Sequence, residues 1–340
     1  MLVINQSEVI QALPMRACVE LMRETLAALA KGHAVQPLRT HIATPDRRGI
    51  LGLMPGYLAP ARALGIKILT IFPANEGTAI DSHQGAVLLF EEERGTLIAL
   101  LDATAITGIR TAAVSGLATD LLAPANAGDL AVLGAGTQAL THVEAMMAVR
   151  PIRRLRLWNR TPSRGQRLAA LIESRFNQSV ELCPSVEDAV TGAEIICTTT
   201  AAREPILQSQ WVTPGAHLNV VGSSIPRTRE TETALMVRAK LFVDVRESAL
   251  HEPGDIVIPL QEGAIAADHI VAELGELVSG LKSWQRREGD ITLFKSQGIA
   301  VEDIASARFV YEAAKRLGLG TEIAVGGEAM AHSAPDPAAG

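Results

Sequence analysis

The chain is poor in aromatic residues and in cysteines, and it has no long apolar run. Phe, Trp and Tyr together make up 3% of its 340 residues, so the core must be built from aliphatic side chains. The three cysteines, Cys18, Cys183 and Cys197, are too few and too scattered for a disulfide framework or a CxxC metal site. They indicate a reducing compartment, which we take to be the cytoplasm. The segment Met1–Asn5 lacks a basic n-region and a long apolar segment, so no secretory signal is predicted.

Charge and apolar content exclude two further classes of protein. The 31 Lys and Arg residues against 37 Asp and Glu residues give a net charge of −6, which argues against a nucleic-acid binder. The longest uncharged stretch, residues 205–226, is interrupted by polar residues and prolines, so no membrane span is predicted. A chain of this length with 48% hydrophobic residues predicts about two domains, each with a full core.

Between residues 114 and 300, short apolar segments alternate with amphipathic ones. The apolar segments predict buried parallel strands at Asp129–Leu133, Leu155–Asn159, Val180–Leu182, Ile195–Thr199, His217–Val221 and Leu241–Asp244. Helices are predicted between them at Thr137–Val149, from a cap at Thr161 or Ser163 to about Phe176, and at Ser185–Thr191. This alternation predicts an α/β domain with a doubly wound parallel sheet.

Residues 1–113 have a different pattern. A helix is predicted at Pro14–Lys31, followed by extended segments at Gly49–Pro55, Leu64–Leu69 and Gly85–Phe90. The charged, glycine-terminated Glu91–Gly95 predicts a hairpin turn. We therefore expect an α+β domain with antiparallel or mixed strands. The last ten residues, 331–340, have the composition of a disordered tail.

A glycine-rich turn separates the first strand and helix of the α/β domain. Gly134-x-Gly136-x-x-Ala139 matches the dinucleotide fingerprint in the strand-turn-helix context that the motif requires. Its backbone and helix N-terminus suit a pyrophosphate, so a Rossmann-type NAD(P) domain is predicted. The residues predicted to contact the pyrophosphate are Gly134, Ala135, Gly136, Thr137 and Gln138.

Residues after the second strand bear on the choice of cofactor. An NAD site has an Asp or Glu there, which binds the ribose 2′-hydroxyl. This chain has Asn159, Arg160 and Thr161, with Arg164 one turn later. Two arginines beside a neutral residue suit a 2′-phosphate, so NADP(H) is predicted over NAD(H). The alternative is that both arginines are ordinary solvated charges.

Three basic residues of the first domain lie in apolar or glycine-rich surroundings: Arg39, Lys67 and Arg110. A lysine in the middle of an apolar strand is costly to bury unless it has a partner, so a carboxylate or a bound anion is expected. The alternative is a lysine on the solvent face of a half-buried strand. His83, beside a glycine turn, suggests by itself a structural role. The eight histidines show no metal-ligand spacing and there is no nucleophile elbow, so no metal is predicted.

Five segments in order resemble the ornithine cyclodeaminase/mu-crystallin family: Gly65–Lys67, His83–Gly85, Thr107–Ala113, Leu133–Gln138 and Phe294–Gly298. The resemblance extends from the N-terminal helix to about residue 317. It implies a homodimer in which residues 1–113 and 301–330 form a substrate-binding and dimerisation domain. It also implies hydride exchange at the α-carbon of an amino or imino acid.

The resemblance assigns roles to residues as well. Arg39, Lys67 and Arg110 match carboxylate-binding positions, with Lys67 also assisting proton transfer, and His83 joins them on the substrate side. The residues implied on the nicotinamide side are Thr111, Thr198, Thr199, Val221, Ser223, Lys295 and Ser296.

One departure from the family favours imine reduction. Cyclodeaminases and alanine dehydrogenases of the family have an acid/base aspartate where this chain has Ser224, and a serine is not a general base at neutral pH. We therefore predict an NAD(P)H-dependent reductase of small cyclic imino acids, 1-pyrroline-2-carboxylate or 1-piperideine-2-carboxylate, which yields L-proline or L-pipecolate. The alternatives are an NAD+-dependent ornithine cyclodeaminase, an alanine dehydrogenase-like enzyme, and a non-catalytic NADPH-binding protein of the crystallin type.

Overall fold

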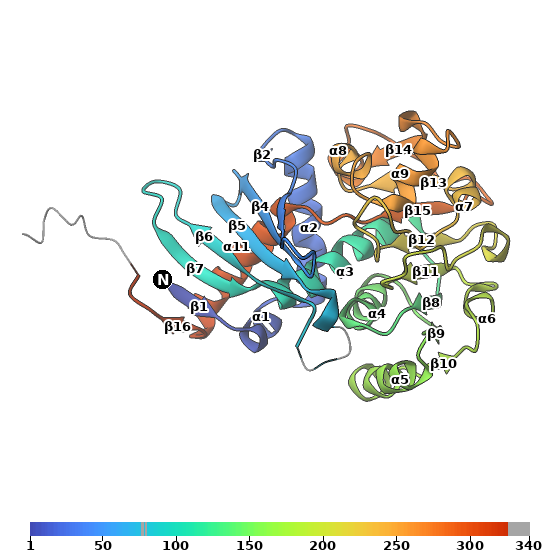
Figure 1. Ribbon diagram of the computed structural model, residues 1–340, viewed down its shortest axis with the longest axis horizontal. Coiled ribbons are helices and arrows are strands. Elements are labelled where there is room, and N and C mark those ends of the chain that lie inside the picture. The colour runs from blue at the N-terminus through green and yellow to red at the C-terminus, as the bar shows by residue number, and fades with distance from the viewer. Residues whose placement is uncertain (76–77, 79, 326–340) are drawn as a thin grey trace, which may run out of the picture.

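Two sheets and one long helix between them organise the computed structural model, which describes residues 1–75, 78 and 80–325 (Figure 1). The tail expected at residues 331–340 lies outside the described residues, as do the last five residues of the segment 301–330. None of the described helices is long and apolar enough to cross a membrane.

The first sheet is mixed, as expected, and has the order β16-β1-β7-β6-β5-β4-β2, with β3 beside β4. Its only parallel neighbours among the described strands are β1 and β7, and the predicted turn at Glu91–Gly95 joins β6 to β7. The strands are β1 (Leu2–Ile4), β2 (Ala34–Val35), β3 (Thr40–Ala43), β4 (Ile50–Leu58), β5 (Ala63–Ile71), β6 (His83–Phe90), β7 (Leu97–Asp102) and β16 (Thr321–Glu322). Its helices are α1 (Gln6–Ala12), α2 (Met15–Ala30) and α11 (Ala300–Leu317).

The second sheet is wholly parallel, in the order β10-β9-β8-β11-β12-β15-β13-β14. Its strands are β8 (Asp129–Leu133), β9 (Arg154–Trp158), β10 (Glu181–Leu182), β11 (Ile195–Thr198), β12 (His217–Val220), β13 (Lys240–Val243), β14 (Ile270–Glu273) and β15 (Thr292–Lys295). Its helices are α4 (Thr137–Val149), α5 (Pro162–Phe176), α6 (Val186–Val190), α7 (Thr233–Arg238), α8 (Arg246–Ala249), α9 (Gly254–Gln261) and α10 (Leu274–Val278). The predicted doubly wound α/β class is confirmed.

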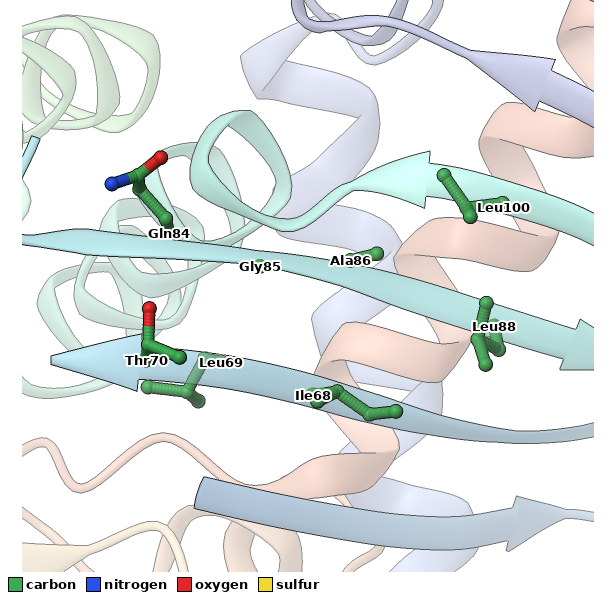
Figure 2. A pocket seen from close by; sticks show the side chains of 8 residues that line it. All are labelled: Ile68, Leu69, Thr70, Gln84, Gly85, Ala86, Leu88 and Leu100. Atoms are coloured by element: carbon green, nitrogen blue, oxygen red, sulfur yellow. The ribbon is translucent and has the colours of Figure 1, made fainter. Parts of the chain in front are cut away.

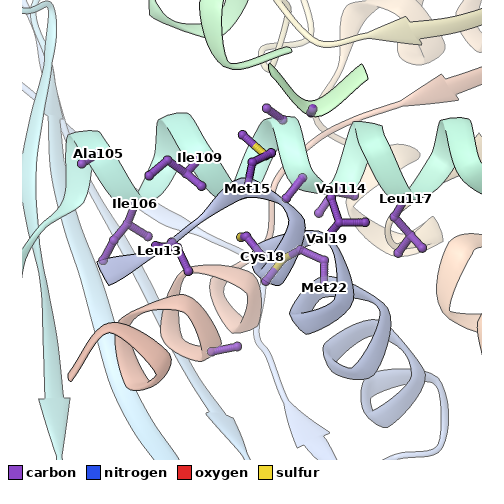
Figure 3. Packing of buried hydrophobic residues seen from close by; sticks show 14 of the residues in the cluster. Leu13, Met15, Cys18, Val19, Met22, Ala105, Ile106, Ile109, Val114 and Leu117 are labelled. Atoms are coloured by element: carbon purple, nitrogen blue, oxygen red, sulfur yellow. The ribbon is translucent and has the colours of Figure 1, made fainter. Parts of the chain in front are cut away.

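Helix α3 (Ala103–Leu122) joins the two sheets. It is apolar all round and almost wholly buried, which fits a helix enclosed on every side. Figure 3 shows side chains of α2, among them Cys18 and Met22, packed against Ile106, Ile109 and Val114 of α3. The boundary expected between residues 113 and 114 falls inside this helix, so one rigid element positions residues of both domains.

Helix α5 begins at the predicted place but is capped differently. Thr161 is the N-cap residue, yet its side chain makes no capping hydrogen bond, so the expected side-chain cap at Thr161 is wrong. Pro162 occupies the first position of the helix, where its fixed φ and missing N–H favour a helix start.

Candidate active site

Lys67 faces the interior of the first domain. Along β5, alternate residues point toward the helices or away from them, and Lys67 shares the inner side with Ala63 and Gly65. Only 2% of Lys67 is exposed. The alternative of a lysine on the solvent face is therefore wrong.

Glycines allow α11 to lie close to β4 and β5. Gly56 and Gly65 are paired across these strands, and a Cβ on Gly56 would lie 3.0 Å from the Ile304 side chain of α11. This close approach brings the start of α11, with Glu302 and Asp303, over the strand that carries Lys67. Both carboxylates are fully buried.

Asp303 links two of the predicted substrate-binding residues. One carboxylate oxygen lies 2.6 Å from Lys67 Nζ, and the other accepts a hydrogen bond of 2.8 Å from Arg110 Nε. Arg110 Nη1 donates to Glu302 at 3.0 Å. Among the described residues, Arg110 donates through Nε and Nη1, and no hydrogen bond of its Nη2 is found.

Arg39 lies at the junction of the two domains. Its Nη2 is 2.8 Å from Glu252 Oε2 and donates at 3.0 Å to the carbonyl oxygens of Gln297 and Gly298. The buried Asp244 holds the same segment, because it accepts hydrogen bonds from the N–H groups of Gln297 and Gly298. Gly298 has φ +68° and a Cβ there would overlap the Arg110 guanidinium, so only glycine lets this segment close over Arg110.

The charges in this cluster interact strongly. Desolvation lowers the pKa of Lys67 to about 8; Asp303 opposes the shift, and the charges of Arg110 and Arg39 add to it. Burial alone would raise the pKa of Asp303, but Arg110 and Lys67 outweigh it and hold that pKa below its ordinary value. Desolvation also lowers the pKa of His83, with Asp81 opposing and the Lys67 charge contributing. The structure thus brings Arg39, His83 and Arg110 within electrostatic reach of Lys67.

The glycine-rich turn has the geometry of a dinucleotide site. Gly134 has φ +118°, and a Cβ there would lie 2.7 Å from the Thr199 carbonyl oxygen, so the turn requires glycine. A Cβ at Gly136 would meet nothing within 4 Å, and no side chain caps the N-terminus of α4 that follows. Open space in front of uncapped N–H groups fits a bound pyrophosphate.

Thr107 connects the two halves of the site. Its side-chain oxygen is 3.5 Å from Lys67 Nζ, and its carbonyl oxygen accepts a hydrogen bond of 3.4 Å from Gln138 on α4. Helix α3, which also carries Arg110 and the buried Thr111, therefore places the charged cluster next to the dinucleotide turn.

Several residues predicted on the nicotinamide side hold loops together through their side chains. The Thr198 hydroxyl donates to Glu230 at 2.6 Å, and the Ser223 hydroxyl bonds to Thr228 within its own loop. Lys295 is fully buried; its ammonium donates to the Val220 carbonyl oxygen at 3.2 Å. The prediction that Lys295 contacts the cofactor is wrong for this conformation, because its side chain is directed into the core.

The remaining predicted cofactor residues lie at the carboxyl ends of the strands. Thr199 and Val221 directly follow β11 and β12, and Ser296 follows β15. After β9, Asn159 donates to the Thr161 carbonyl oxygen at 2.8 Å, and Arg160 is exposed beside them. Arg164 lies in the first turn of α5. Arg156, which lies within β9 itself, is buried and paired with Asp129.

Sequence reasoning missed the acidic half of the cluster, namely Asp244, Glu252, Glu302 and Asp303, and also the loop-holding Glu230. One signal was present: Glu302 and Asp303 interrupt an apolar run from Ile299 to Ala305, and two buried carboxylates require cations. Within the described ranges, no group of three His, Cys, Asp or Glu residues is arranged to hold a metal ion.

Three comparisons agree with this geometry. The chain is 44% identical over 281 residues to the ketimine reductase mu-crystallin of Mus musculus, covering 83% of this chain and 86% of the mouse protein. The solved Δ1-pyrroline-2-carboxylate reductase of Thermococcus litoralis, in complex with NADH and L-proline, superposes with a TM-score of 0.93 at 34% identity, covering 95% of this chain and all (100%) of that one. An archaeal alanine dehydrogenase dimer with bound NAD has a TM-score of 0.89 at 29% identity, covering 95% and 99%.

A family model, the ornithine cyclodeaminase/mu-crystallin family, matches residues 1–317. The predicted resemblance is thereby confirmed from the N-terminal helix to the end of α11, together with the nicotinamide-binding fold. The chain therefore belongs to the ornithine cyclodeaminase/mu-crystallin family.

Proposed function

We propose that this chain is an NAD(P)H-dependent reductase of small cyclic imino acids, which converts 1-pyrroline-2-carboxylate or 1-piperideine-2-carboxylate to L-proline or L-pipecolate in the cytoplasm. The observation that carries the proposal is the position of Thr107, which contacts both Lys67 and Gln138. An anion held by the charged cluster therefore adjoins the dinucleotide turn. The activities of the mouse and Thermococcus relatives support the same class of substrate.

The basic residues bind and orient the substrate. Its carboxylate approaches Nη2 of Arg110 and the Lys67 ammonium, with Arg39 at the edge of the cluster. Asp303 fixes both Lys67 and Arg110, so neither side chain has to be ordered when the ligand binds. Positioning of this kind contributes several kcal/mol to lowering a barrier, of the ~7–11 kcal/mol available from orientation.

The reduction needs a hydride at the α-carbon and a proton at the nitrogen. A bound dihydronicotinamide supplies the hydride. The proton comes from Lys67 or from water; Lys67 suits the task because its pKa of about 8 is close to neutral pH, where a general acid works best. Ser224 brings no carboxylate to the loop after β12, which agrees with a reaction that starts from a preformed C=N bond.

NADPH is the proposed reductant in preference to NADH. The end of β9 presents Asn159 in place of an acid, and a hydrogen bond to the Thr161 carbonyl fixes its side chain. Arg160 and Arg164 follow at positions that suit a 2′-phosphate. The Thermococcus relative binds NADH, so the two cofactors must be compared directly in this chain.

The proposed enzyme is a homodimer that associates through the outer face of the first sheet. In the part of the chain that the structure describes, α11 packs against the inner face of β4, β5 and β6, where Lys67 lies. Outer-face residues of β5, β6 and β7, including Ile68, Leu88 and Leu100, line a shallow apolar hollow (Figure 2). An exposed apolar hollow on a sheet face suits a protein interface, and the archaeal alanine dehydrogenase is a dimer. Leu88→Asp should yield monomers in light scattering, whereas a monomeric wild type would refute the dimer.

A steady-state assay tests the activity. NADPH oxidation is measured with pyrroline-2-carboxylate and piperideine-2-carboxylate, and with pyruvate plus ammonia. Turnover confined to the cyclic imines supports the proposal. Ammonia release from ornithine without added reductant would instead identify a cyclodeaminase, and turnover of pyruvate plus ammonia an alanine dehydrogenase. Tight NADPH binding with no turnover on any substrate would identify a binding protein.

A further inference from the structure

The charges in the substrate cluster do not balance. The cluster has three cations, Arg39, Lys67 and Arg110. Its four carboxylates are those of Asp244, Glu252, Glu302 and Asp303. If all of them were ionised, the cluster would be negative before an anionic substrate entered it. A buried site of that kind would repel a carboxylate.

Three of the four carboxylates have partners that favour the charged form. Asp303 contacts Lys67 and Arg110. Asp244 accepts three backbone N–H groups, those of Val245, Gln297 and Gly298. Glu252 pairs with Arg39 at 2.8 Å and lies near the surface.

Glu302 differs from these three because one of its oxygens is buried without any partner in the described part of the chain. Its Oε2 shares Arg110 with Asp303 and accepts the Ile299 N–H at 3.3 Å. Its Oε1 is buried and has no partner among the described residues. An ionised carboxylate with one unpartnered oxygen is expensive to bury, and the neutral acid removes most of that cost.

We propose that Glu302 is protonated in the working enzyme, and that this proton leaves Arg110 with one ionic partner, Asp303, so that its guanidinium can bind the substrate carboxylate. The inference rests on the proposed function for the identity of the anion. Glu302 touches Arg110 and not the reacting atoms, so it is a positioning residue. It sets the charge of the cluster that selects for an anionic ligand.

The groups that face Glu302 from each side support this assignment. Burial raises the pKa of Glu302 to about 8; Arg110 of α3 opposes the shift, while Asp244 after β13 and Asp303 on the same helix add to it. Cys18 of α2 is also near, and burial raises its pKa to about 12, so its thiol stays neutral. Ser306, one turn along α11, carries no charge. Arg110 is therefore the cation next to Glu302, and Asp303 already shares it.

Protonation of Glu302 makes substrate binding depend on pH. Below about 8 Glu302 is neutral, and above that pH it ionises and competes with the substrate for Arg110. Lys67, with a pKa of about 8, loses its charge in the same range. Substrate binding should therefore weaken as pH rises for two separate reasons, and a substitution at Glu302 removes only one of them.

Infrared difference spectroscopy detects the proton on the Glu302 carboxyl group without any ligand or turnover. We expect a protonated-carboxyl C=O band in the wild-type enzyme at pH 7 that is absent from Glu302→Gln and disappears as the pH is raised through about 8. Glu24→Gln, which removes an exposed carboxyl of α2, serves as the control and should keep the band. Absence of the band from the wild type would overturn the inference while leaving the reductase activity standing.

Binding of pyrrole-2-carboxylate, a planar unreactive analogue, in the presence of NADPH tests the consequence. Gln mimics the neutral acid, so Glu302→Gln should bind the analogue at pH 7 with an affinity within about twofold of that of the wild type. Between pH 7 and pH 9, the affinity of the wild type should fall by a factor roughly ten times larger than that of the variant. Much tighter or much weaker binding by the variant at pH 7, or an unchanged pH dependence, would overturn the inference. A wild type that does not bind the analogue at all would overturn the proposed substrate. The infrared band would still show whether Glu302 is protonated.

Discussion

The two halves of the proposed site are built in different ways to bind an anion. The dinucleotide turn uses backbone: Gly134 and Gly136 leave room, and the uncapped N-terminus of α4 supplies N–H groups. The substrate cluster uses buried side-chain charges that are already paired, with Asp303 between Lys67 and Arg110. A backbone site tolerates changes in nearby charge but not in shape, whereas the charged cluster tolerates little change in charge.

The largest expected effect is at Lys67. Lys67→Met keeps most of the side-chain volume but removes the charge, so kcat/KM for pyrroline-2-carboxylate should fall by roughly 10³-fold, the scale of losing one electrostatic contact at a reacting centre. Steady-state kinetics measure the change. The exposed Lys31 provides a control, because Lys31→Met should keep wild-type kinetics. A near-normal kcat/KM of Lys67→Met would refute the claim that the buried charged cluster is needed to bind the substrate.

Asp303→Asn should chiefly affect stability. It leaves Lys67 and Arg110 buried with one carboxylate fewer, and breaking a buried ion pair in this way costs about 3–5 kcal/mol. Urea denaturation of the two proteins measures this cost. Asp46, in an exposed pair with Arg48, is the matched control, and Asp46→Asn should not shift the midpoint. Equal stability of Asp303→Asn and the wild type would show that Asp303 does not pair with Lys67 and Arg110 in the absence of ligand.

Gly136→Val tests the backbone half. The new side chain meets no protein atom near its Cβ but fills the space in front of α4, so NADPH should bind roughly 100-fold more weakly, a loss of about 2.7 kcal/mol. The melting temperature without cofactor should stay the same. Gly134→Ala is the contrasting variant, because strain against Thr199 should also lower that melting temperature. Unchanged cofactor affinity in Gly136→Val would place the pyrophosphate elsewhere.

The smallest expected effect concerns the choice of cofactor. Arg160→Ala combined with Arg164→Ala should reduce kcat/KM with NADPH by roughly tenfold and leave NADH almost unaffected, because the proposed contact of the two guanidinium groups is with the 2′-phosphate that NADH lacks. The readout is the ratio of the two efficiencies. A wild type that prefers NADH would contradict the assignment before any substitution is made.

The same comparison explains what the sequence could predict. The dinucleotide turn is contiguous, and its glycines and flanking elements can be recognised within about ten residues of sequence. The α/β class, strands such as Asp129–Leu133 and helices such as Thr137–Val149 follow from local periodicity. The cations Lys67 and Arg110 stood out because charge in an apolar segment is unusual.

Their partners could not be predicted in the same way. Asp303 reaches Lys67 only because Gly56 and Gly65 let α11 lie close to the sheet, more than 200 residues along the chain. Lys295 was misassigned for a related reason. Its neighbours in the sequence suggest a cofactor loop, but its side chain turns toward the Val220 carbonyl and Asp255. Pairings of this kind depend on tertiary packing, which a single sequence does not encode in any local pattern.

The most direct test follows the hydride itself. The enzyme is given pyrroline-2-carboxylate and NADPH carrying deuterium on the transferable C4 position, and the product is analysed by mass spectrometry and NMR. If the charged cluster holds the carboxylate so that the α-carbon meets the nicotinamide, L-proline should carry one deuterium at its α-carbon. Proline without deuterium, or no proline at all, would contradict the account.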